Sequence, residues 1–177
     1  LFDQLSDSPI TYDEATNLWI FRDPLDTGRQ NSVELPESWA IEVTSLFRMA
    51  VKDGNADTSA TAIGYQLQRV RLDDDQTFTQ WVDDYSEQRE TDVESQEVVT
   101  VNNREIVIQV ENSTSLDQRT TNYYVADSDG DLIVLITQSM VENQEVLRED
   151  IVVMASTVES EELTWEEQLR SAGILEE

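Results

Sequence analysis

The chain has 177 residues, which is enough for one domain with a sizeable hydrophobic core. It carries 38 acidic against 11 basic residues, and this net charge of −27 excludes nucleic acids and anionic membrane surfaces as direct partners, because both are bound through Lys and Arg. It contains no Cys and no His, which excludes disulfides, thiolate or imidazole catalysis and the usual zinc, copper and haem sites.

The first third of the chain is predicted to be mostly extended. Residues 1–17 are polar with scattered apolar positions, and we expect a tail there that leads into a strand at 18–21, "LWIF". The segment 23–31, "DPLDTGRQN", has the Pro, Gly, Asp and Asn content of a loop. Strands are expected near 32–35 and 43–52, separated by a proline that interrupts the extended run.

The apolar periodicity changes in the middle of the chain. Residues 60–71 place apolar side chains at alternate positions, which predicts a strand with one buried face. The next apolar residues recur at the spacing of one helix face: Phe78, Trp81, Val82 and Tyr85. Thr77 and Gln80 fit a capping box, so we expect a helix to begin there.

Two hairpins and a helix are predicted next. The segment 97–111 alternates around Asn102-Asn103, a pair that tolerates positive φ, and 121–138 forms the second hairpin. Residues 143–158 space their apolar side chains by four, three and four, which favours a helix lying on a sheet face. A β-branched run within this segment leaves a strand open as the alternative.

The last predicted element is a short helix. Thr164 and Glu167 form a second capping box, and Gly173 stands where such a helix stops. Consecutive strands without intervening helices pair antiparallel. The order of elements therefore predicts the α+β class, with helices packed on an antiparallel sheet.

Three stretches resemble the Mog1/PsbP-like superfamily. "SVELPESW" at 32–39 resembles its opening motif of a short strand, Pro, polar residues and Trp, and "YQLQRVRLDDDQTFTQWVDDY" at 65–85 resembles its strand-helix unit. Two hairpins and a final helix that ends at Ala155-Ser156 complete the pattern. The resemblance covers roughly 18–160, and none of its motifs is a catalytic constellation.

The resemblance implies an α-β-α sandwich, with a central antiparallel sheet of about six or seven strands and two or three helices. It implies one domain at 18–160, between an N-terminal tail at 1–17 and a short C-terminal helix and tail at 161–177. Most members of the superfamily are binding or assembly modules rather than enzymes. No functional residue of the superfamily can be carried over to this sequence.

One acidic stretch is a candidate metal site. Asp127, Asp129 and Asp131 stand at alternate positions, as in a calcium loop. The glycine and the distal glutamate of such a loop are missing, whereas Asp129-Gly130 is a dipeptide preferred in two-residue hairpin turns. We therefore expect a turn between two strands, with weak Ca²⁺ binding at most and no other cofactor.

Other candidate groups have simpler interpretations. The run Asp73–Asp75 places negative charge ahead of a helix, where the helix dipole favours it. Trp81 lies on the predicted buried helix face, whereas Trp165 is equally compatible with exposure and with docking. Tyr123-Tyr124 are adjacent in a strand, so one of them is expected on the sheet surface.

The function expected from these observations is that of a non-catalytic binding or assembly module with a protein partner. The chain begins at Leu1 rather than Met, which favours an extracytoplasmic protein (periplasmic, cell-surface or secreted) with a membrane anchor in a missing N-terminal segment. Lys52 is the only lysine, and dense carboxylates with so little lysine are typical of salt-adapted proteins, although an ordinary acidic surface remains the alternative. Two other functions stay open: a carboxylate-dependent hydrolase acting on glycans, and a calcium-dependent adhesion or scaffold protein.

Overall fold

The computed structural model describes most of the chain: residues 11–13, 15–23, 26–37, 39–43, 48–52, 62–68, 72–112, 118–126, 132–140, 144–171 and 174–175. The strands are β1 (Thr11–Asp13), β2 (Leu18–Asp23), β3 (Asp26–Glu34), β4 (Trp39–Val43), β5 (Arg48–Lys52), β6 (Ala62–Gln68), β7 (Val93–Val101), β8 (Arg104–Glu111), β9 (Gln118–Ala126), β10 (Leu132–Met140) and β11 (Glu159–Glu162). The helices are α1 (Phe78–Gln88), α2 (Gln144–Ser156) and α3 (Trp165–Ser171).

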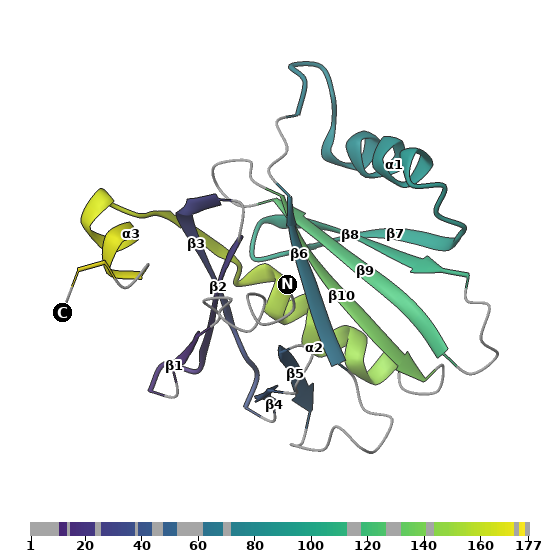
Figure 1. Cartoon of the computed structure of the whole chain (residues 1–177). Helices are drawn as coiled ribbons and strands as arrows, with labels where there is room; N and C mark the ends of the chain where they lie inside the picture. Colours follow the sequence, from purple (N-terminus) through teal and green to yellow (C-terminus); the bar gives the residue numbers. More distant parts are fainter. Residues whose placement is uncertain are drawn as a thin grey trace.

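The described strands form two antiparallel sheets (Figure 1). The large sheet has seven strands in the order β4-β5-β6-β10-β9-β8-β7, and the small sheet has four in the order β1-β2-β3-β11. The α+β class predicted from the sequence is therefore confirmed. The expectation of one central sheet was incomplete, because the N-terminal strands and β11 form a sheet of their own.

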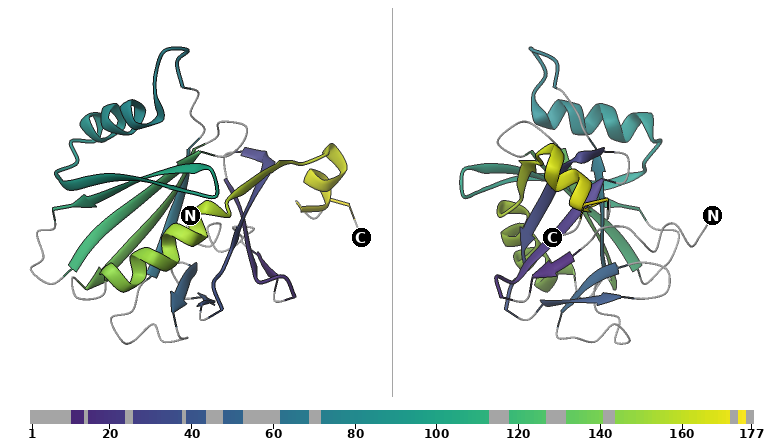
Figure 2. Two further views of the ribbon diagram at one scale, coloured as in Figure 1. Left: turned by 180° about the vertical axis from the view of Figure 1, so that it is seen from behind. Right: turned by 60° about the vertical axis from the view of Figure 1, so that its left-hand side comes forward.

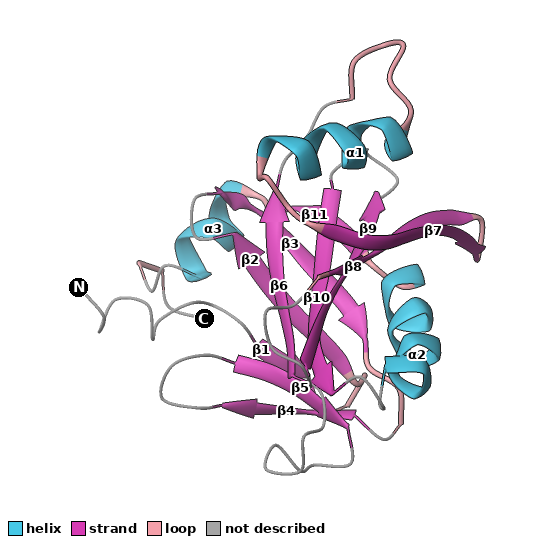
Figure 3. Cartoon of the chain, turned by 90° about the vertical axis from the view of Figure 1, so that its right-hand side faces the viewer, coloured by secondary structure: helices cyan, strands magenta, loops and turns pink. Residues whose placement is uncertain are grey.

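Helices cover both faces of the large sheet. On one face, α2 buries Ile151 and Met154 in the main core, together with Ile106 and Tyr123 of the sheet. On the other face, α1 covers Val107 and Tyr124 through Val82 and its neighbours. Because alternate residues of a strand point to opposite faces, β8 and β9 contribute to both cores. Two further views show these layers, and in a third β4 and β5 lie at the end of the molecule opposite α1 (Figures 2 and 3).

The structure corrects three predictions for the N-terminal third. The predicted loop 23–31 contains most of β3, and part of the predicted tail 1–17 forms β1. The strand predicted at 43–52 is instead a pair, with β4 ending at Val43 and β5 beginning at Arg48. β3 forms although its residues have low strand propensity, because it is hydrogen-bonded to β2 along one edge and to β11 along the other.

β11 is an element that the sequence did not predict, and it joins the C-terminal part of the chain to the small sheet. Ser160 stands opposite Asn31 of β3. Arg104 of β8 donates to the Val158 carbonyl and pairs with Glu159 at 2.7 Å, so the large sheet also contacts the start of β11. The predicted domain boundary at residue 160 falls inside this strand.

Local sequence signals explain several other elements. Thr77 and Gln80 form the predicted capping box of α1, with Gln80 N to Thr77 Oγ1 at 3.2 Å and Thr77 N to Gln80 Oε1 at 2.9 Å. Asn102 and Asn103 have φ of 52° and 61°, as a two-residue hairpin turn requires. The helix interpretation of 143–158 is confirmed by α2, whose apolar face lies on the core.

Candidate functional site

The predicted calcium residues Asp127, Asp129 and Asp131 lie outside the described residues, so weak Ca²⁺ binding there stays a prediction. The hairpin itself is confirmed, with Ala126 of β9 opposite Leu132 of β10. The turn predicted at Asp129-Gly130 lies outside the described residues and stays a prediction as well. Within the part of the chain that the structure describes, no three acidic side chains are grouped so as to hold a metal ion.

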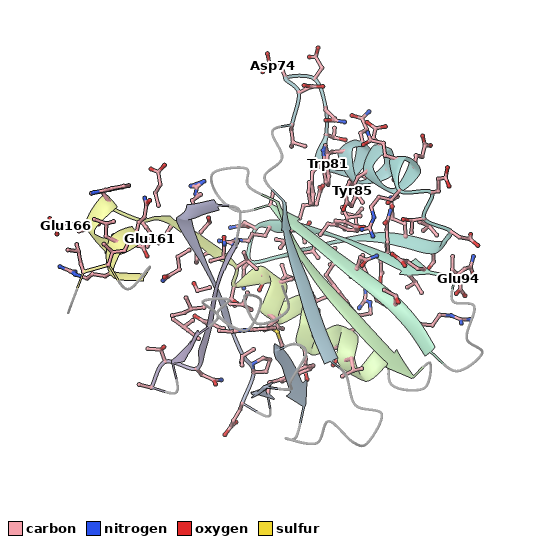
Figure 4. All side chains as sticks on the ribbon, in the orientation of Figure 1. Asp74, Trp81, Tyr85, Glu94, Glu161 and Glu166 are labelled. Carbon is pink, nitrogen blue, oxygen red and sulfur yellow. The ribbon has the colours of Figure 1, made fainter. Side chains whose placement is uncertain are left out.

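The run Asp73–Asp75 does not belong to any described site. All three side chains are exposed, and the run lies before the N-cap Thr77 rather than in the first turn of α1. The Gln76 amide nitrogen donates to the Asp73 carbonyl at 2.9 Å, which closes a turn (Figure 4 labels Asp74 at its tip). These carboxylates form a solvated acidic surface.

An aromatic cluster fills the space between α1 and the large sheet. The rings of Trp81 and Tyr85 stack with centroids 4.9 Å apart, and Tyr85 meets Tyr124 edge-on at 6.2 Å. Arg89 lies over the Tyr85 ring at 5.4 Å and donates to its hydroxyl at 3.2 Å. Trp81 is only half-buried, so it lies at the rim of this cluster and not in the centre of a core.

Both tyrosines of the Tyr123-Tyr124 pair are buried, which corrects the expectation that one would lie on the sheet surface. Tyr123 packs in the main core on the α2 side, and Tyr124 packs under α1. Burial raises the pKa of Tyr124 to about 12, although a hydrogen bond with Ser86 acts in the opposite direction. The phenol is therefore protonated at neutral pH and is a poor base or nucleophile.

A chain of hydrogen bonds runs from this cluster to the surface. Ser86 Oγ donates to Gln109 Oε1 at 2.7 Å, and Gln109 Nε2 donates to Gln96 Oε1 at 2.6 Å. Gln96 Nε2 in turn donates to Asp83 Oδ1 at 2.9 Å. Because both amides of this chain are satisfied by neighbours, the arrangement fixes α1 on the sheet and leaves no activated group.

A different arrangement surrounds α3, which lies beyond the small sheet at the edge of the molecule (Figures 1 and 2). Leu163 anchors its start, because the side chain is buried and the amide nitrogen donates to the Gly28 carbonyl of β3 at 2.8 Å. The predicted box is present, with Thr164 N to Glu167 Oε2 at 2.7 Å and Glu167 N to Thr164 Oγ1 at 3.3 Å. The position of α3 is thus defined by the sheet and by its own cap.

Apolar side chains are exposed along α3 and just after it. Trp165 is 71% exposed, Ile174 is 69% exposed and Leu175 is 42% exposed. Leu169, one turn from Trp165, is half-buried, and its carbonyl accepts from the amide nitrogen of Ile174 at 2.9 Å. We call Trp165, Leu169, Ile174 and Leu175 the C-terminal strip. The bond from Ile174 has the pattern of a Schellman motif, although Gly173 itself lies outside the described residues.

Acidic side chains flank the C-terminal strip. Glu161 and Glu162 of β11 and Glu166 and Glu167 of α3 are all exposed. Figure 4 shows Glu161 and Glu166 at this end of the molecule. Arg170 is the one basic residue of α3, and it lies 3.8 Å from Glu166. The strip is therefore an apolar surface in a negatively charged setting.

Sequence reasoning named Trp165 as a residue that could be exposed or docked, and it missed Ile174 and Leu175. The signal for them was present, because two large aliphatic residues follow a glycine directly in an otherwise acidic C-terminal sequence. Such residues are exposed unless another element covers them, and no covering element was predicted.

No family model matches the sequence, and no curated protein matches it significantly. Solved structures match its fold. LpqN of Mycobacterium tuberculosis, described as involved in cell envelope biogenesis, superposes with a TM-score of 0.51 over 86% of this chain and 98% of its own, at 12% identity. The cyanobacterial PsbP protein CyanoP of Synechocystis sp. PCC 6803 gives a TM-score of 0.46 over 81% of this chain and 92% of its own, at 10% identity.

The fold of this chain is thus shared with LpqN. At this level of identity the likeness concerns the fold alone. Among the described residues, no helix is both long enough and apolar enough to cross a membrane.

Proposed function

We propose that this chain is a non-catalytic, extracytoplasmic binding or assembly module that docks a protein partner. The observation that carries the proposal is the exposed Trp165 on α3. Large aromatic side chains are enriched at the centres of protein interfaces, where they bury much area at little entropic cost. An exposed tryptophan held in place by a capped helix is therefore suited to docking.

The surroundings of the carboxylates support a non-catalytic role. Among the described acidic side chains, Glu111 and Asp150 are the two that are partly buried. Asp150 accepts from Trp39 Nε1 at 2.9 Å on the α2 side, whereas Glu111 accepts from Asn122 Nδ2. A glycan hydrolase needs two acids about 5–10 Å apart across one cleft. These two have separate neutral donors and belong to different elements, so neither supports the hydrolase alternative.

The extracytoplasmic part of the proposal is supported by the shared fold with LpqN, whose description places it in cell envelope biogenesis. The N-terminal membrane anchor expected from the sequence remains a prediction. It is tested by separating membrane and soluble fractions of the source cells and finding which of them holds the protein.

Site-specific photo-cross-linking in the source cells tests the docking role. A photoreactive phenylalanine analogue replaces Trp165 in one variant and Val153 in a second. Val153 is a suitable control because it is 52% exposed on α2, away from the C-terminal strip. We expect one protein to cross-link from position 165 and not from position 153. Equal cross-linking from both positions, or none from position 165, would contradict the proposal.

A further inference from the structure

The chemistry around the C-terminal strip narrows the kind of partner that can dock there. The strip offers an exposed indole and two exposed aliphatic side chains, Trp165, Ile174 and Leu175. Four exposed carboxylates flank it on β11 and α3: Glu161, Glu162, Glu166 and Glu167. A partner surface that covers the strip must place its own groups beside these carboxylates.

Charge decides between the candidate occupants. A second copy of this chain would bring another net charge of −27 to the same surface, and like charges facing each other in an interface disfavour association. An anionic membrane surface meets the same repulsion. A cationic segment is attracted instead, and the attraction also raises its rate of encounter.

We propose that the strip binds a segment of a partner protein, and that this segment is rich in arginine or lysine and also carries apolar side chains. This proposal rests on the proposed docking function. The cations of the segment lie against the flanking glutamates, and its apolar side chains cover Ile174 and Leu175. A guanidinium stacks on the Trp165 ring, a contact that the molecule already makes between Arg89 and Tyr85 at 5.4 Å. Arg170 offers little competition, because its ion pair with Glu166 is long, at 3.8 Å, and both side chains are exposed, and such surface pairs are weak.

The strip is held in place before binding. The β3–β11 ladder, the Leu163 amide bond to Gly28 and the Thr164–Glu167 box fix the start of α3, and the Ile174 bond to Leu169 fixes its end. Binding to a surface that is already ordered does not have to offset the entropy of ordering it. Short cationic peptides are therefore adequate probes of the surface.

The first experiment titrates the full chain with two defined peptides of equal charge and about 12 residues, one alternating Arg and Leu and one alternating Arg and Ser. Tryptophan fluorescence and calorimetry follow binding. We expect the Arg-Leu peptide to bind about tenfold more tightly than the Arg-Ser peptide, and Trp165→Ala to abolish this difference. Equal binding of both peptides, or binding unaffected by Trp165→Ala, would overturn the proposal.

A pair of charge variants separates a local site from attraction to the whole acidic surface. The test variant carries Glu161→Gln, Glu162→Gln and Glu166→Gln, and it keeps Glu167 because that side chain caps α3. The control carries Asp73→Asn, Asp74→Asn and Asp75→Asn, which removes the same charge far from the strip. We expect about tenfold weaker Arg-Leu binding for the first variant and less than about twofold for the second. Equal weakening would show attraction to net charge alone.

Two further measurements test the alternative occupants of the strip, a second copy of the chain and an anionic membrane surface. Light scattering shows whether the chain self-associates through Trp165, and flotation with phosphatidylglycerol vesicles shows whether it binds an anionic bilayer. Self-association or vesicle binding that is lost in Trp165→Ala would show that a second copy or a bilayer, and not a cationic segment, occupies the strip. A partner that cross-links at position 165 but is insensitive to the glutamine variant would refute the cationic inference while the docking function stands.

Discussion

Two helices of this molecule begin with the same local chemistry and lead to different surroundings. Thr77 and Gln80 cap α1, and Thr164 and Glu167 cap α3. Above the large sheet, α1 brings Trp81 and Tyr85 into a stacked cluster. Beyond the small sheet, α3 leaves its tryptophan 71% exposed. A capping box therefore fixes where a helix begins, whereas the presence of a sheet face beneath it decides whether its aromatic residues form a core or a surface.

The largest expected difference between the two regions is in their contribution to stability. Tyr124→Ala should lower the free energy of unfolding by about 3–5 kcal/mol, because it empties a buried aromatic position under α1. Trp165→Ala should change it by less than about 0.5 kcal/mol, because the side chain is exposed. Urea denaturation measures both values. A large loss for Trp165→Ala would show that α3 is part of the core.

Loss of a hydrogen-bonded glutamine side chain should show a smaller difference in stability between the α1 and α3 regions. Gln109→Leu should cost about 1–2 kcal/mol, because it removes the hydrogen bonds of Gln109 with Ser86 and Gln96, each worth about 1 kcal/mol. The matched change on α3 is Gln168→Leu, which loses a bond to the Leu163 carbonyl and should cost less than about 1 kcal/mol. Denaturation of the two variants side by side tests this order, and equal costs would contradict it.

Alkaline pH should weaken the α1 region selectively. The pKa of Tyr124 is about 12 in the folded chain against an ordinary value of 10.0, because burial disfavours the phenolate. Between these values the unfolded chain releases the proton and the folded chain keeps it, so stability falls as pH rises from about 10 toward 12. The fall should be shallower in Tyr124→Phe and unchanged in Trp165→Ala. Denaturation curves over this pH range measure the slopes.

The two caps should give the smallest differences in global stability. Thr77→Ala should cost about 1 kcal/mol, because it removes the side-chain acceptor of the Gln80 amide at the start of α1. Thr164→Ala should leave global unfolding nearly unchanged, because α3 is peripheral and can loosen on its own. It should nevertheless weaken Arg-Leu peptide binding about threefold. Unaltered peptide binding would mean that the cap does not position the C-terminal strip.

The sequence predicted those parts of the fold whose signals are local. The capping box of α1, the positive φ at Asn102-Asn103 and the apolar spacing of α2 depend on residues close in the chain. It failed where distant pairing decides the structure. β3 and β11 contain Gly, Asn, Ser and Glu, and they are strands because each supplies the other with ladder partners.

The candidate site was predicted in part, for the same reason. Trp165 was identified as a candidate, but its exposure depends on how distant elements pack around α3, which no local pattern reports. The burial of both Tyr123 and Tyr124 also depends on distant elements, because α2 covers one face of β9 and α1 covers the other.

The pairing of β3 with β11 also has a kinetic consequence. Its two strands come from opposite ends of the sequence, and the neighbouring bond from the Glu34 amide to Thr157 Oγ1 closes 123 residues of chain. Contacts of such long range are slow to form, because the intervening chain must be ordered first. We therefore expect the surface that carries Trp165 to be completed late in folding. A partner that requires this surface would engage finished molecules and pass over nascent or partly folded ones.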